Sequence, residues 1–257
     1  MDDDYPAAGV VRSFTRPRYF HGQLLDVRHF ESEQAYFKRK QWMLNRLISG
    51  FGVVCGLDVQ VGEDDHSVVV LPGVALDRRG REIVVPSRSK KIPIEPKPAQ
   101  EAGEGGRNGR SDDGCCDDDW AHLVICYDEC KTDPEPVLSG GCEGPERCSP
   151  GAIREGYALH IEPGKARDIP VDPSIPNLIK GNNVNYRALA EWVSMPCDRP
   201  GDACIALANI RLPTGEGTVE LSHIDISVRP IVYSLDVLWQ LVLSLVHETQ
   251  NRRAGRN

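Results

Sequence analysis

The stretch that decides the fold covers residues 18–58 and reads RYFHGQLLDVRHFESEQAYFKRKQWMLNRLISGFGVVCGLD. Large apolar side chains recur in it every seven residues, at Phe30, Phe37, Leu44 and Phe51. Such a repeat is typical of a helix with one apolar seam. Asp26 suits the start of this helix as its N-cap, and Gly50 and Gly52 suit its end because glycine adopts the left-handed turn that closes a helix. We therefore expect one long helix that runs directly into a first β-strand.

A second row with the same spacing is partly polar and consists of Val27, Gln34, Gln41 and Ile48. Two interpretations follow from these rows. The helix is either a core helix of a single domain or one side of a seam between subunits. In the seam, the glutamines would set the register, as buried polar residues do in coiled coils.

From Val53 onward the apolar period changes from helical to alternating, which predicts a β-meander. The expected strands cover residues 57–61, 67–71, 74–76 and 82–85, with a short edge piece at 91–94. Arg81 and Glu82 are expected to be solvated charges at the rim. Residues 95–119 form a polar, glycine-rich insertion with little to bury, which indicates a flexible loop.

Further strands are expected at residues 122–127, 153–161 and 204–212, with 218–227 pairing back and a short helix at 185–194. Residues 129–150 consist almost entirely of turn-forming residues and contain three cysteines. The fold class is therefore α+β. The expected parts are an N-terminal arm (1–17), the helix with its meander (18–94), the insertion (95–119), a cysteine-loop β-rich domain (120–233), and a C-terminal helix with its tail (234–257).

The C-terminal helix is expected to start after Ser234, a good N-cap. Nine of the twelve residues from 235 to 246 are apolar, and the other three form one narrow polar stripe. A helix with this pattern must be covered on several sides, either centrally in the chain or by copies of itself or a partner. We expect interface side chains on both long helices, namely Phe30, Phe37, Leu44, Leu235, Leu238, Trp239, Leu241, Val242 and Leu245.

Composition narrows the function classes. The 257 residues carry a net charge of −8 without a basic block, which argues against nucleic acid as a partner. The acidic start is unlike a secretory signal, and the apolar run at 235–246 is too short to span a membrane. We expect assembly in the cytoplasm. No nucleophile elbow, phosphate loop, dinucleotide fingerprint or H-E-x-x-H motif occurs, so we expect no enzyme.

The nine cysteines are the residues of this sequence that most clearly suggest a specific chemistry. Cys130, Cys142 and Cys148 bracket the turn-rich segment and could hold a structural zinc ion, with a fourth ligand from Cys115, Cys116 or Cys126. Disulfides formed after release from the cell, or free thiols, are the alternatives. Cys197 and Cys204 form a second candidate pair, and Cys55 is expected to be a buried small apolar residue.

Residues 18–58 resemble a recurrent module of phage tails and contractile injection systems. In that module an aromatic G-Q-x-L stretch leads into a helix with E-Q-x-Y and then N-R-x-x-x-G-x-G-V-V-x-G-L. The matching residues are Tyr19, Phe20, Gly22, Gln23, Leu24, Glu33, Gln34, Tyr36, Asn45, Arg46, Gly50, Gly52, Val53, Val54, Gly56 and Leu57. The segment PGVALDRRGREIVVP is similar to the module's β-segment at Pro72, Gly73, Ala75, Asp77, Gly80 and Val84.

The resemblance covers residues 18–160 well and the C-terminal third more loosely. It implies a structural subunit of the baseplate, fibre attachment or tail periphery, forming a homo-oligomer such as a trimer or hexamer. Its partners would be other particle subunits, and a released particle would carry it outside the cell. Two other functions stay open. One is a metal-stabilised module that binds a protein or glycan through its cysteine-rich loop, and the other is a hydrolytic enzyme of the same particle.

Overall fold

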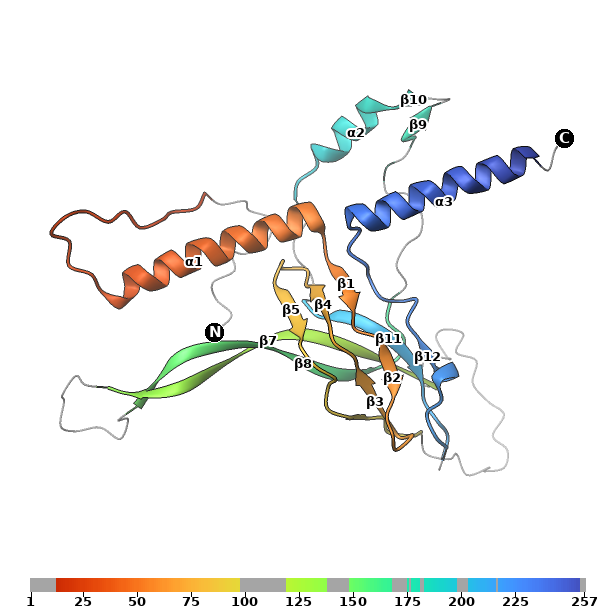
Figure 1. Cartoon of the computed structure of the whole chain (residues 1–257), viewed down its shortest axis with the longest axis horizontal. Coiled ribbons are helices and arrows are strands. Elements are labelled where there is room, and N and C mark those ends of the chain that lie inside the picture. Colours follow the sequence, from red (N-terminus) through yellow and green to blue (C-terminus); the bar gives the residue numbers. More distant parts are fainter. Residues whose placement is uncertain are drawn as a thin grey trace, which may run out of the picture. The chain divides into compact units, whose positions relative to one another are not determined.

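The computed structural model describes residues 13–97, 119–137, 148–167, 175, 177–180, 183–197, 203–215 and 217–254. The fold is mixed α+β, as predicted, with helices and antiparallel sheets (Figure 1). The chain forms two compact units. Unit 1 comprises the described parts of Met1–Gln41 and Asp168–Asp202, and unit 2 comprises those of Trp42–Arg167 and Ala203–Asn257.

The predicted N-terminal helix is confirmed as α1 (Val27–Leu44), which continues as a π-helical turn (Asn45–Ser49). Its start is capped differently from the prediction. The backbone N–H of Asp26 donates to Nδ1 of His29 over 3.2 Å, while the Asp26 carboxylate lies 3.4 Å from Nε of Arg28. The wider π-helical turn shifts the residues that follow it out of the seven-residue register.

Unit 2 contains two small antiparallel sheets of three strands each. The first sheet has the order β1 (Gly52–Gly56), β4 (Gly73–Leu76), β5 (Glu82–Val85). The second has the order β2 (Val59–Val61), β3 (Ser67–Val70), β6 (Ile92–Pro93). The predicted strands are therefore present. They do not form one meander, however, because the chain changes sheet after β1, after β3 and after β5.

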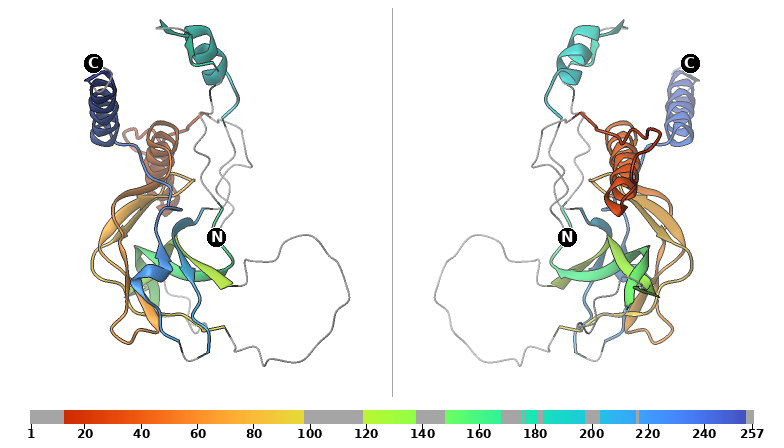
Figure 2. Two further views of the ribbon diagram at one scale, coloured as in Figure 1. Left: turned by 90° about the vertical axis from the view of Figure 1, so that its right-hand side faces the viewer. Right: turned by 90° about the vertical axis from the view of Figure 1, so that its left-hand side faces the viewer.

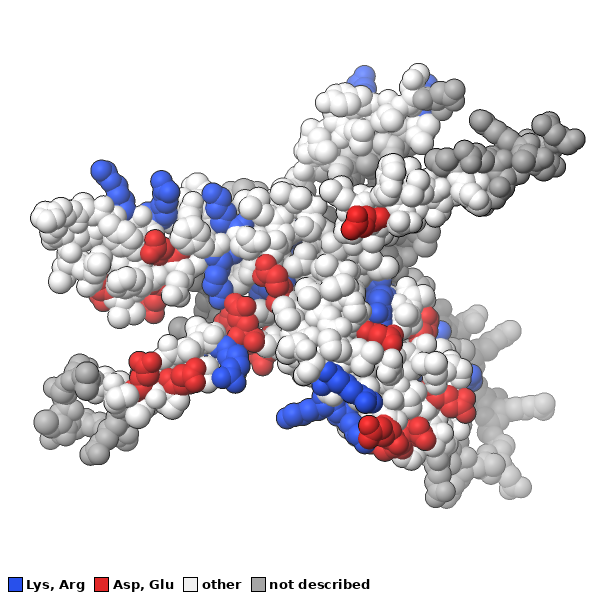
Figure 3. Space-filling model, in the orientation of Figure 1, with Lys and Arg blue, Asp and Glu red and all other residues white. Residues whose placement is uncertain are grey.

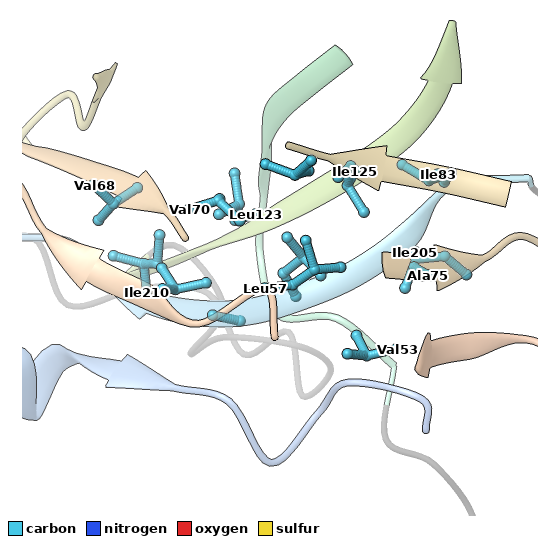
Figure 4. Packing of buried hydrophobic residues seen from close by; sticks show 14 of the residues in the cluster. Val53, Leu57, Val68, Val70, Ala75, Ile83, Leu123, Ile125, Ile205 and Ile210 are labelled. Carbon is cyan, nitrogen blue, oxygen red and sulfur yellow. The ribbon is translucent and has the colours of Figure 1, made fainter. Parts of the chain in front are cut away.

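A four-stranded antiparallel sheet completes unit 2. Its order is β12 (Ile224–Asp225), β11 (Ile205–Arg211), β7 (Trp120–Pro136), β8 (Cys148–Pro163). Figure 2 shows the strands of the small sheets on one side of this sheet. Apolar side chains from all three sheets, including Val68, Ile83, Leu123 and Ile210, point toward one another between them (Figure 4). Residues of the expected parts 18–94 and 120–233 thus contribute to one core.

The β7–β8 hairpin is longer than predicted. The turn chemistry of residues 129–150 suggested a loop, but β7 continues to Pro136 and β8 already starts at Cys148. Pro134 lies opposite Pro150 in the outer part of this hairpin. Prolines are tolerated there because both strands of a two-stranded ribbon are edge strands. The outer half of the ribbon is exposed on both faces and extends away from the other strands (Figure 1).

The remaining helices begin where their caps predict. In unit 1, α2 (Tyr186–Val193) starts after Asn185, whose side-chain oxygen accepts from the N–H of Ala188, and the short strands β9 (Ile179–Lys180) and β10 (Asn183–Val184) precede it. In unit 2, α3 (Leu235–Ala254) starts after Ser234, whose hydroxyl accepts from Val237. The expected strand at 218–227 is reduced to β12, preceded by a 3-10 turn (Leu221–His223).

Some predictions lie largely outside the described residues. They include the arm, apart from residues 13–17, and the insertion, apart from residues 95–97 and 119. Within the described residues, no helix combines the length and apolar character that crossing a bilayer requires.

Candidate interface surfaces

The apolar seam of α1 is open. Val27, Phe30, Phe37 and Leu44 keep 66, 50, 62 and 41 % of their surface exposed. The seam glutamines, Gln34 and Gln41, are also exposed. No residue of α1 is buried, and this exposure favours the interpretation as one side of a seam between subunits.

A different face of α1 is covered by the preceding chain segment. The ring of Phe14 meets that of Tyr36 edge-on at 6.2 Å, and the hydroxyl of Tyr19 donates to the Glu33 carboxylate over 3.0 Å. Desolvation, followed by the hydrogen bond to Glu33, raises the pKa of the Tyr19 hydroxyl. The segment at 13–26 thus packs on the helix without covering the seam.

The end of α1 is joined to the β body by Asn45 and Gly80. The side-chain amide of Asn45 donates to the Gly80 carbonyl over 2.9 Å and to the Glu82 carboxylate over 2.6 Å. Gly80 has φ +86°, and a Cβ on it would overlap the carbonyl of Trp42. The approach of helix and turn therefore requires glycine here.

The turn before β5 is built around a buried carboxylate. Asp77 is fully buried and accepts hydrogen bonds from the N–H groups of Arg79 and Arg81 and, over 2.6 Å, from Nε of Arg81. The Arg81 guanidinium lies over the Tyr127 ring at 4.5 Å. Arg81 and Glu82 are therefore structural residues, and their prediction as solvated rim charges was wrong. The sequence feature that could have indicated this turn is Asp77 itself, because an aspartate side chain often accepts a hydrogen bond from the backbone N–H two residues further on, as in an Asx turn.

Tyr127 links this turn to the base of the long hairpin. Its hydroxyl donates to the Glu129 carboxylate over 2.6 Å. Desolvation first, and then the hydrogen bond to Glu129, raise the pKa of this phenol well above its usual value. Tyr127 therefore remains neutral, which suits a hydrogen-bond donor under a guanidinium.

A second joint connects β1 with the segment that leads to α3. The N–H of Val53 donates to the Pro230 carbonyl over 2.8 Å, and Val232 donates back to Val53 over 3.0 Å. Gly52 lies so close to Pro230 that a Cβ would overlap its backbone. The glycine–valine pair of the module thus anchors the approach to the C-terminal helix.

The helix α3 presents an almost uncharged surface along its described side chains, with Asp236 near its start (Figure 3). The six predicted interface residues on it are all exposed, from 45 % for Leu238 to 85 % for Leu235. In α2, Trp192 and Val193 are 43 and 69 % exposed. Each of the three helices therefore carries apolar side chains that the described chain leaves open.

The cysteines pair differently from the prediction. Cys126 of β7 and Cys204, which directly precedes β11, form a disulfide across 78 positions of sequence. Cys204 therefore does not pair with Cys197, and Cys126 cannot serve as a zinc ligand. Cys55 was expected to be buried but is an exposed free thiol. The pairing of β1 with β4 is irregular between Val53 and Cys55, as at a β-bulge. This irregularity changes which side chains of the strand face the core.

The structure does not bring the described members of the predicted zinc set together. Cys130 lies opposite Arg154, whereas Cys148 lies opposite Pro136, six residues further along the hairpin. At about 3.3 Å per residue this separates them by roughly 20 Å along the ribbon. Both are exposed free thiols, and Cys142 lies outside the described residues. The zinc site stays a prediction, and the hairpin geometry does not support it.

Among the described residues, no three histidine, cysteine, aspartate or glutamate side chains gather closely enough to hold a metal ion. The half-buried His122 has a structural environment, because its Nδ1 lies 2.9 Å from the Gly164 carbonyl and its Nε2 lies 3.2 Å from Glu162. The open helix faces are therefore the candidate functional surfaces.

Comparison with known proteins adds no family. No protein-family model matches the chain, and no curated protein matches it.

Proposed function

We propose that the chain is a non-enzymatic structural subunit of a phage-tail-like contractile injection particle, placed in the baseplate, at a fibre attachment or as a peripheral adaptor. One observation carries the proposal. All nine predicted interface side chains are exposed, by 41 to 85 %, although they lie on regular helices. Apolar surface displayed in this way favours a protein partner.

Two further features support this role. The module residues Asn45, Gly52 and Gly80 hold the ends of helical segments on the β body, as a scaffold requires. The disulfide between Cys126 and Cys204 suits a protein that is assembled in the cytoplasm and then works in a released, oxidising setting. A homo-oligomer, such as a trimer or hexamer, and neighbouring particle subunits would cover the helices.

Density-gradient fractionation of cells that make a tagged chain tests the particle role. We expect the tag to sediment with sheathed particles that are visible by negative-stain electron microscopy. In matched cells lacking the sheath protein, the tag should move to light fractions. A tag that stays in light fractions while intact particles sediment would contradict the proposal.

A further inference from the structure

We propose that α1 pairs in parallel and in register with α1 of a second copy of this chain. This inference deepens the proposed function and rests on the part of it that says the chain associates with copies of itself. It does not depend on the kind of particle in which the chain is found. The seam consists of Val27, Phe30, Gln34, Phe37, Gln41 and Leu44.

The spacing and exposure of the seam favour a helix as its occupant. Its six residues alternate steps of three and four, which places them along one stripe, as in a coiled coil. All six are exposed. The contacts of Phe14 and Tyr19 are made with Tyr36 and Glu33, which lie outside the stripe.

The charged residues beside the seam indicate that the partner helix is α1 of a second copy. Glu31 and Glu33 flank its first half, and Lys38 and Lys40 flank its second half. In a parallel, in-register pair, Glu33 of one copy lies beside Lys38 of the other, five residues further on. This acid-then-base order makes the helix complementary to itself.

An antiparallel pair would also match these charges, so the glutamines must decide the direction. With helix ends aligned antiparallel, the side-chain amide of Gln34 would face Phe37, which offers it no hydrogen bond. In parallel, each glutamine faces the same glutamine, and their amides can hydrogen-bond. A buried amide without a partner costs more than an exposed ion pair contributes, so the parallel arrangement is favoured.

Photo-crosslinking of the full chain tests the direction. A benzophenone amino acid replaces Phe30, which it resembles in shape, and the labelled chain is mixed with a heavy-isotope copy before irradiation. We expect crosslinks between copies to fall within residues 26–34. Crosslinks to residues 37–44, to α3, or to no second copy would each overturn the proposal.

The same probe at Ser32 is the matched control. Ser32 is exposed on α1 but lies off the seam, where its hydroxyl donates to the Arg28 carbonyl over 2.6 Å. Moving the probe there should lower the yield of inter-copy product by about tenfold or more, because that position points away from a coiled-coil partner. Equal yields would mean random contact and would overturn the proposal.

The two proposals fail separately. Parallel crosslinks in the purified chain, without co-sedimentation with particles, would leave the pairing intact and contradict the particle role. Co-sedimentation without crosslinks between α1 helices would contradict only the pairing.

Discussion

Gly80 is the residue that lets the end of α1 lie against the turn before β5. We expect Gly80→Ala to destabilise unit 2 by more than the roughly 1–3 kcal/mol that an unfavourable backbone conformation costs, because the new Cβ would also meet the Trp42 carbonyl. Gly50→Ala is the control, since Gly50 has φ +78° with open space around it. Urea unfolding of both variants measures the difference. Equal losses would show that the close approach contributes nothing.

The environment of Asp64 predicts that part of the free energy of unfolding depends on acidic pH. Hydrogen bonds from Ser67 first, and then from Lys91, lower the pKa of this carboxyl group from 3.8 to about 2. The charged form is therefore favoured in the folded chain. Its stabilisation is complete above the ordinary pKa and is lost as pH falls from about 4 toward 2.

We expect Asp64→Asn to lower the Tm at neutral pH and to flatten the change in Tm between pH 4 and pH 2. Thermal unfolding followed by circular dichroism across this range measures both effects. Asp65→Asn changes the neighbouring exposed carboxylate and should retain the wild-type pH profile. An Asp64→Asn profile parallel to that of the wild type would show that the Ser67 and Lys91 contacts are not maintained in solution.

At the scale of elements, α3 predicts assembly behaviour. Leu238→Asp or Leu241→Asp places a charge on the apolar surface, and buried anchor residues at interfaces contribute about 2 kcal/mol or more. We expect either variant to raise the dissociation constant of the proposed oligomer by roughly 30-fold or more, as native mass spectrometry would measure. Both leucines are about half exposed in the chain, at 45 and 48 %, so folding should be retained.

Gln240→Asp is the matched control for α3. Gln240 is exposed between these leucines on the polar stripe, and its replacement should leave the subunit count unchanged. Leucine variants that assemble like the wild type would show that α3 is not an interface.

For the whole molecule, the disulfide predicts a dependence on redox conditions. The disulfide joins Cys126 in β7 to Cys204 directly before β11, and β7 and β11 are the two central strands of the four-stranded sheet. A bridge across a long loop typically contributes about 2–4 kcal/mol to the free energy of unfolding. We expect a reducing agent to lower that free energy by this amount, and Cys126→Ser combined with Cys204→Ser to remove the response. Cys55→Ser, at an exposed free thiol, is the control and should respond like the wild type.

Much of the fold could be predicted because local signals specify it. The seven-residue repeat predicted α1, and the N-cap of Ser234 predicted the start of α3. Alternating apolar residues and turn-forming pairs located β2 to β5 closely. These signals act over a few residues, so neighbouring side chains and backbone preferences are sufficient to express them.

The sequence by itself determined α1, α3, the strands β2 to β5, the α+β class and the apolar stripes of the long helices. Only the tertiary structure decided that β7 extends to Pro136, that the buried Asp77 pairs with Arg81, and that Cys126 pairs with Cys204. It also decided that the seam of α1 stays open. Each of these outcomes depends on contacts between segments far apart in the chain, and periodicity carries no information about which distant segment will cover a face.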